Sequence, residues 1–239
     1  MRITNNVYLL SGDYFSAVNN SAVLGCVYGI RTDKGIILID AGNPVSGPAM
    51  LRETLAYFDV NEPITHLIIT HAHIDHSGGA AELQKAGAKV IVGQEDAMYC
   101  TNGGFSGMNS PFDDSHGFPA LNPDICIAED RAMEINGLDF KFIKIPGHTP
   151  GSIAVLVTVD KKTVLFTGDA LQPDGITLGL VTLGWQGDPG FSSKAIVDSM
   201  MKLLKYETDM ILPGHGRICL RNGTAVLRLA AKTAALTLR

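Results

Sequence analysis

Residues 71 to 76 read HAHIDH, so three of the seven histidines in the chain and one aspartate lie within six positions. Neutral imidazole and carboxylate groups are the nitrogen and oxygen ligands that zinc and the neighbouring first-row metals prefer in proteins. A solvated polar turn that is merely rich in histidine is the alternative. The block therefore predicts a metal site if other parts of the chain bring further ligands to it.

Further ligand-type side chains come just after predicted strands. The strands expected over 35–39, 66–70, 138–145, 163–167 and 210–212 lead into Asp40, His71, His148, Asp169 and His215, in that order. Loops at the carboxyl ends of strands lie together at one edge of a layered α/β fold, so we expect these side chains to converge. For Asp40, a cap that accepts a nearby backbone N–H is an alternative explanation.

On these five motifs, the chain resembles the metallo-β-lactamase superfamily of binuclear metallohydrolases over about residues 3–216. The resemblance implies an α/β fold of four layers, an αββα sandwich in which two mixed β-sheets are flanked by helices. It also implies the following ligand sets: His71, His73 and His148 for one ion, Asp75, His76 and His215 for the other, and Asp169 bridging both. Asp40 would then orient the HAHIDH loop.

The expected cofactor is a pair of divalent ions, zinc in the first instance, with iron or manganese as alternatives. Three neutral imidazoles leave a tetrahedral ion one open position for water. Two cations lower the pKa of that water from 15.7 toward about 7, so that a metal-bound hydroxide can attack an acyl carbon or a phosphorus. Asp75 is the predicted catalytic residue, which would hold or relay the proton.

The remaining elements are expected to form one domain over residues 1–239, without a separate C-terminal substrate domain. Further strands are predicted over 3–10, 22–30, 89–92, 132–135 and 153–159, and helices over 48–58, 80–87, 193–205 and 224–236. Two irregular stretches, 99–123 and 172–190, are rich in Gly, Pro, Asn and Asp. Loops of this length inside a domain are usually functional or disordered, so we expect them to border the site.

Composition narrows the classes of partner. Hydrophobic residues make up 46% of the chain and the formal net charge is −5, which leaves no basic footprint for nucleic acid. The first residues do not read as a signal peptide, and no apolar run approaches the roughly 18 residues of a membrane span. The four cysteines are scattered, as expected for reduced thiols of a cytoplasmic protein. A homodimer is a further possibility, because aromatic side chains of the long loop could pack on a second subunit.

The predicted mouth of the site favours an uncharged substrate. No Lys or Arg occurs between Val90 and Asp130 or between Thr163 and Ser193, although an anionic substrate would normally need one there. The candidate substrate-binding residues are Tyr99, Phe105, Met108, His116 and Trp185. Such a lining suits a small ester, lactone or thioester. Alternatively, the aromatic residues only pin the loops to the body, and His116 is a solvated loop histidine.

Branches of the superfamily differ in ways that bear on this chain. True β-lactamases lack the aspartate that corresponds to Asp169, and oxygen-reducing diiron relatives carry Glu where this chain has His73. Glyoxalase II-like thioesterases match the motifs but bind glutathione through cationic side chains, partly from a C-terminal extension. A mononuclear iron persulfide dioxygenase, with His71, His148 and Asp169 as ligands, has the same block and stays open. His66 and Cys219 are expected to be a strand imidazole and a buried thiol, outside the metal site.

Overall fold

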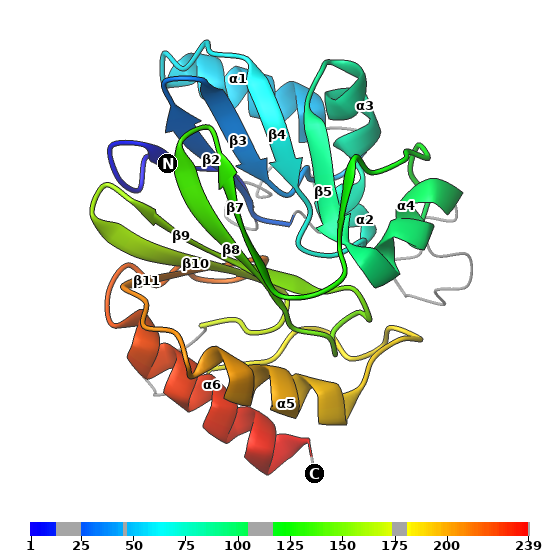
Figure 1. Cartoon of the computed structure of the whole chain (residues 1–239), viewed down its shortest axis with the longest axis vertical. Coiled ribbons are helices and arrows are strands. Elements are labelled where there is room, and N and C mark those ends of the chain that lie inside the picture. The colour runs from blue at the N-terminus through cyan, green and yellow to red at the C-terminus, as the bar shows by residue number, and fades with distance from the viewer. Residues whose placement is uncertain (13–24, 45–46, 105–116, 174–180, 239) are drawn as a thin grey trace.

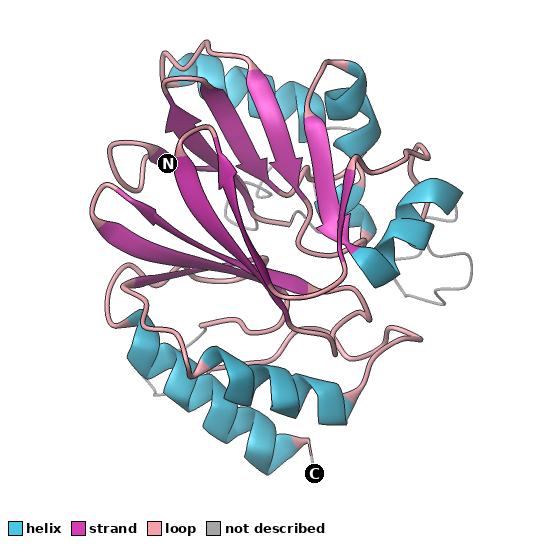
Figure 2. Cartoon of the chain, viewed as in Figure 1, coloured by secondary structure: helices cyan, strands magenta, loops and turns pink. Residues whose placement is uncertain are grey.

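Two β-sheets lie face to face with helices on their outer sides in this computed structural model, which describes residues 1–12, 25–44, 47–104, 117–173 and 181–238 (Figures 1 and 2). The helices α1 and α3 cover the N-terminal sheet, and α5 and α6 cover the C-terminal sheet (Figure 1). The predicted αββα sandwich of two mixed sheets is therefore confirmed.

The N-terminal sheet has the order β1-β2-β3-β4-β5-β6. Its strands are β1 (Val7–Ser11), β2 (Val27–Thr32), β3 (Gly35–Ile39), β4 (Ile64–Ile68), β5 (Lys89–Gly93) and β6 (Ile125–Ile127). β1, β2 and β3 pair antiparallel, whereas β3, β4, β5 and β6 pair parallel. Parallel neighbours need crossover connections, which here contain the helices α1 (Gly47–Tyr57), α2 (Ile74–Ser77), α3 (Ala80–Lys85) and α4 (Ala97–Asn102). The carboxyl ends of β3, β4 and β5 consequently meet at one edge.

The C-terminal sheet has the order β11-β10-β9-β8-β7. Its strands are β7 (Arg131–Ile135), β8 (Leu138–Lys144), β9 (Ile153–Val159), β10 (Lys162–Gly168) and β11 (Met210–Pro213). Only β10 and β11 pair parallel, through a crossover that contains α5 (Ser193–Leu203). The chain ends with α6 (Gly223–Thr237), which packs with α5 on the outer face of this sheet.

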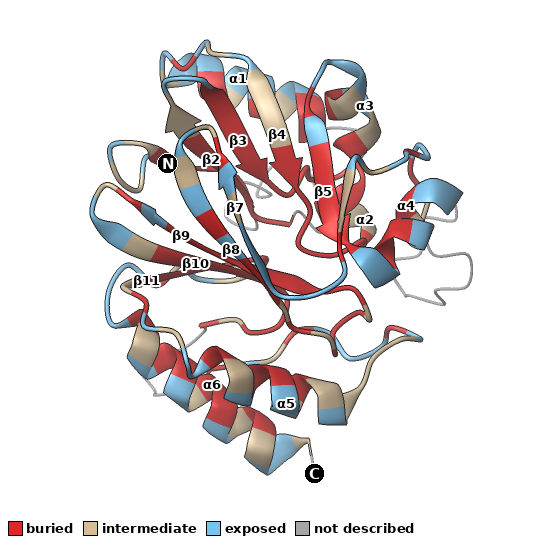
Figure 3. Ribbon diagram, in the orientation of Figure 1, coloured by how far each residue is buried: buried red, intermediate tan, exposed pale blue. Residues whose placement is uncertain are grey.

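Most strands, such as β3, β9, β10 and β11, are buried on both faces, which explains why they read as almost continuous apolar runs, whereas β7 is largely exposed and β8 alternates between exposed and buried positions (Figure 3). In β9, Ile153, Val155 and Val157 point into the core between the sheets, whereas Ala154 and Leu156 point toward α5 and α6. Each fully buried Val, Leu or Ile contributes about 1.5–3 kcal/mol relative to an exposed side chain. This rigid double core holds the strand ends in place.

The structure corrects the sequence-based prediction mainly at short helices and strands. The irregular stretch predicted from residue 99 begins as the helix α4, because Ala97 and Cys100 pack on the outer core before Gly103 ends the helix at a φ of 74°. The strand β6 was missed, since three residues are too few for a periodic signal. β4 ends at Ile68, so that His71 lies three residues beyond the strand. None of the helices in these described ranges has the length and apolar character that crossing a membrane requires.

Candidate metal centre

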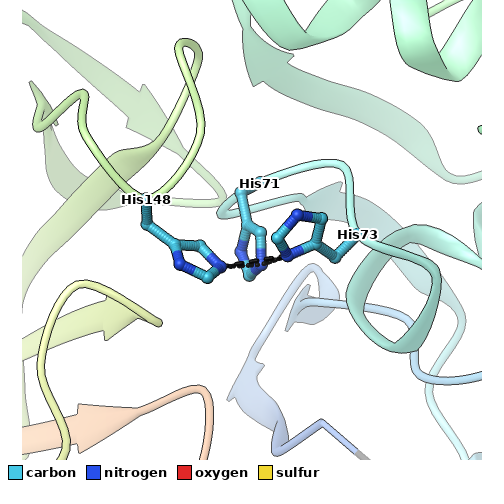
Figure 4. A group of neighbouring side chains, drawn as sticks. All are labelled: His71, His73 and His148. Carbon is cyan, nitrogen blue, oxygen red and sulfur yellow. Dashed lines mark hydrogen bonds between the residues drawn. The ribbon is translucent and has the colours of Figure 1, made fainter. Parts of the chain in front are cut away.

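Three histidines from both halves of the sandwich point their ring nitrogens at one another (Figure 4). His71 and His73 lie in the loop after β4, and His148 lies in the loop between β8 and β9. The Nε2 atom of His71 is 3.0 Å from Nδ1 of His73 and 3.2 Å from Nε2 of His148, and the latter two atoms are 3.0 Å apart. All three side chains are buried.

This spacing fits a tetrahedral cation. Zinc–nitrogen bonds of about 2.0–2.1 Å place two tetrahedral ligands roughly 3.3 Å apart, close to the three observed separations. Imidazole nitrogens so near one another cannot all carry a proton. The His71, His73 and His148 group, called the three-histidine group below, can therefore hold a metal ion.

A second group, called the Asp75 group below, consists of Asp75, His76 and His215. Nε2 of His215 is 2.9 Å from Oδ2 of Asp75 and 3.3 Å from Nε2 of His76. Asp75 and His76 lie in the one-turn helix α2, which the sequence did not predict. His215 follows β11.

Asp169 lies between the two groups, directly after β10. Its Oδ2 atom is 3.6 Å from Nε2 of His148 and 3.5 Å from Nε2 of His215, and its Oδ1 atom is 3.4 Å from Nε2 of His76. Oδ1 is buried and has no hydrogen-bond partner in the described part of the chain. A buried carboxylate oxygen without a donor costs free energy, which a cation between the two groups would recover.

The outward-facing nitrogens of four histidines are also engaged. The pairs are His71 Nδ1 with Thr70 Oγ1 at 3.1 Å, His73 Nε2 with Asp188 Oδ2 at 2.8 Å, His76 Nδ1 with Asp40 Oδ2 at 2.9 Å, and His148 Nδ1 with the Trp185 carbonyl at 3.0 Å. Such partners fix the tautomer and the orientation of a ligating imidazole and raise its basicity. The lone pairs of the inner nitrogens are consequently directed into the two groups.

Burial prepares the three-histidine group for a metal. It lowers the pKa of His71 well below its usual value and lowers the pKa of His148 to about 4, so both rings are neutral at pH 7. His76 behaves in the opposite way. Burial opposes its charge, but the carboxylates of Asp75, Asp169 and Asp40 outweigh burial and raise the pKa of His76 well above its usual value. The three carboxylates around His76 therefore stabilise positive charge at this place, whether it is carried by the imidazolium or by a bound divalent ion.

Asp40 both caps backbone and orients a histidine, so the two sequence-based interpretations agree with its contacts. It is buried just after β3 in the left-handed region, with a φ of 64°, which Asp adopts more readily than most residues. Its Oδ1 atom accepts the backbone N–H of Thr70, and its Oδ2 atom accepts the Thr70 hydroxyl and bonds His76. One carboxylate therefore holds the start of the HAHIDH loop and one ring within it.

The structure brings all seven predicted metal ligands together, and their role as ligands stays a prediction. Trp185 lies beside the site, with its ring 5.9 Å from that of His73 and the residue 39% exposed. Tyr99 is half-buried on α4 against the outer core, which agrees with a pinning role.

The other residues that the sequence singled out lie elsewhere or are not described. Phe105, Met108 and His116 fall outside the described residues. His66 lies on β4 beside Thr65, apart from these groups. Cys219 is a buried thiol that donates to the carbonyl of Arg221.

Three residues at the site escaped the sequence analysis: Thr70, Asp96 and Asp188. Asp96 accepts hydrogen bonds from Ala72 of the HAHIDH block and from the loop of His148. No motif marks Asp96 or Asp188, since each acts across the fold and neither has a histidine nearby in sequence. The irregular character of 172–190 was the only available signal for Asp188.

Known proteins resemble this chain in sequence and in fold. The model of the family described as "Metallo-beta-lactamase superfamily" matches residues 23–215. The probable metallo-hydrolase YflN of Bacillus subtilis is 26% identical over 200 residues, 75% of each chain. The hydroxyacylglutathione hydrolase GloC of Haemophilus influenzae is 28% identical over 193 residues, 77% of this chain and 81% of the relative.

A solved structure shows the same fold at lower identity. The subclass B3 metallo-beta-lactamase BJP-1 of Bradyrhizobium japonicum superposes with a TM-score of 0.73 at 22% identity and covers 98% of this chain and 90% of that one. The likeness concerns the fold, whereas the family match includes the motif residues from Asp40 to His215. This chain belongs to the metallo-beta-lactamase superfamily.

Proposed function

We propose that the protein is a hydrolase that uses two divalent ions, zinc in the first instance, to cleave an ester, lactone or thioester bond in a small uncharged substrate. One observation carries the proposal: the three-histidine group and the Asp75 group face each other across Asp169, whose buried Oδ1 atom has no donor among the described residues. A single ion in the three-histidine group would not account for the second set of converging donors, the Asp75 group.

Asp169 and Asp75 have different roles in the proposed reaction, the first in metal binding and the second in proton transfer. When bound, the two cations supply a water of lowered pKa and polarise a carbonyl oxygen. Asp169 sets the spacing of the two groups. The Asp75 side chain is 14% exposed, against 6% for Asp169, so its carboxylate can reach solvent at the edge of the cluster. Asp75 is therefore our candidate for accepting a proton from the attacking water and passing it to the leaving group.

The surroundings of the site support the proposed substrate class. The indole of Trp185 offers an apolar contact beside His73. The segments 90–130 and 163–193, which we expect to border the site and which include Asp169, Trp185 and Asp188, contain neither Lys nor Arg. These features favour an uncharged acyl group over a phosphate, and the net charge of −5 disfavours nucleic acid. The similarity to a hydroxyacylglutathione hydrolase supports a thioester as one of the bonds to test.

The test combines metal analysis with a substrate panel. Protein purified without chelators should contain two zinc-like ions per chain and should cleave at least one uncharged ester, lactone or thioester without consuming oxygen. One iron per chain, with oxygen uptake on a persulfide, would assign the protein to the dioxygenase branch instead. Activity confined to glutathione thioesters would retain the two-ion chemistry and overturn the proposed preference for uncharged substrates.

A further inference from the structure

A buried carboxylate three residues after β5, that of Asp96, connects the two loops that supply the three-histidine group. Asp96 is fully buried and belongs to neither loop. Its Oδ2 atom accepts the backbone N–H of Ala72, between His71 and His73, at 2.9 Å. Its Oδ1 atom accepts the backbone N–H of Gly151 at 2.7 Å, in the loop that carries His148.

The same carboxylate receives a third bond from the second loop. The Thr149 hydroxyl, next to His148 in sequence, donates to Oδ2 of Asp96 at 2.8 Å. The two oxygens of a carboxylate can accept all three of these hydrogen bonds, whereas the single oxygen of an amide side chain cannot. Since both oxygens only accept, an Asn side chain here would turn an amide N–H₂ toward at least one of these donors.

Asp96 stands at a helix start but does not use its side chain to cap the helix. It is the residue before the helix α4, where an Asp side chain usually accepts a helical N–H, yet its side chain makes no such capping bond. Glycines permit the close approach instead. A Cβ atom at Gly151 would lie 2.5 Å from Oδ1 of Asp96, and one at Gly93 would lie 1.8 Å from the carbonyl oxygen of Gly151.

We infer that Asp96 is a positioning residue that fixes His148 relative to His71 and His73, and so sets the metal affinity of the three-histidine group alone. The hydrogen bonds of its carboxylate reach both loops of that group, and among the described residues none of these bonds runs to Asp75, His76 or His215. A general structural role would weaken both groups equally. The inference rests on the proposed function, because it requires that the two groups bind ions.

The experiment isolates each group by substitution. In an H215A background the three-histidine group is the intact one, and in an H73A background the Asp75 group is. Asp96→Asn is added to each, and Zn²⁺ affinity is measured by competition with a chromophoric chelator. Partners of metal-ligating side chains typically change affinity by about 10–100-fold, so we expect such a loss in H215A and less than about 2-fold in H73A.

A second substitution and a control keep the outcome decisive. Thr149→Val, which removes one donor and keeps both backbone bonds, should give a smaller loss in the same background if the Asp96 variant does not fold. Asp124→Asn serves as the matched control, because that exposed carboxylate accepts the backbone N–H of Val90 at 2.8 Å outside both groups. Thermal unfolding in EDTA reports the folding of every variant.

The outcomes separate the two proposals. Equal losses in both backgrounds, or unchanged affinity in H215A, would overturn the positioning role while leaving the hydrolase proposal in place. Two bound ions in a wild-type protein that cleaves nothing in the panel would overturn the hydrolase proposal and leave the role of Asp96 intact. A wild-type chain that binds no ion would overturn both.

Discussion

Removal of Asp188 offers the sharpest test of how the three-histidine group is oriented. The Asp188 side chain is fully buried, and its Oδ2 atom lies 2.8 Å from Nε2 of His73. A hydrogen bond to a charged partner contributes about 1.5–3 kcal/mol, and a buried N–H left without an acceptor costs a similar amount. With about 2 kcal/mol lost from the metal-bound form, Asp188→Ala should bind Zn²⁺ about 30-fold more weakly, since each 1.4 kcal/mol is tenfold.

The assay is Zn²⁺ competition with a chelator, run on wild type, Asp188→Ala and Asp188→Asn. The Asn variant should lose less, because its one carbonyl oxygen can still serve His73 if the bond from Gly190 N–H to Oδ1 is given up. Asp160→Ala is the control, since that carboxylate bonds Asn6 at the opposite end of β9 and should change stability without changing metal affinity. Wild-type affinity in Asp188→Ala would refute the argument that this carboxylate orients the ligand.

Further predictions concern the metal ligands and pH. Asp169→Ala should lose at least one of the two ions and most of the activity, measured by metal content and by hydrolysis of the best panel substrate; full activity would exclude the two-ion mechanism. His73→Ala should also lose metal and most activity, whereas His66→Ala, on the strand β4, should keep both. Acidification should release the ion of the Asp75 group first, because the pKa of His76 is raised and protons compete there at higher pH than at His148, whose pKa is about 4. Metal content after dialysis at decreasing pH checks this order, and simultaneous release of both ions would contradict it.

Much of the candidate site was visible in the sequence because ligating side chains are dense and locally ordered. The HAHIDH block contributes four donors by itself, and His148, Asp169 and His215 each follow a strand closely. Most strand patterns were readable because strands such as β3, β9 and β10 are buried on both faces, whereas β8 shows the alternation of a strand with one exposed face. The helix α2 was not predicted, since a four-residue helix has no periodicity to detect.

What the sequence by itself determined is the set of donors, the alternation of apolar strands and helices, and the scarcity of cations around the expected mouth. Tertiary structure alone decided which carboxylates lie behind which imidazoles. Asp96 lies 24 positions from Ala72 and is brought to it by the pairing of β4 with β5, whereas Asp188 lies 115 positions from His73 and reaches it because one sheet packs on the other. Local sequence encodes propensity and pattern, whereas such contacts depend on the three-dimensional path of a chain whose two halves must meet at one edge.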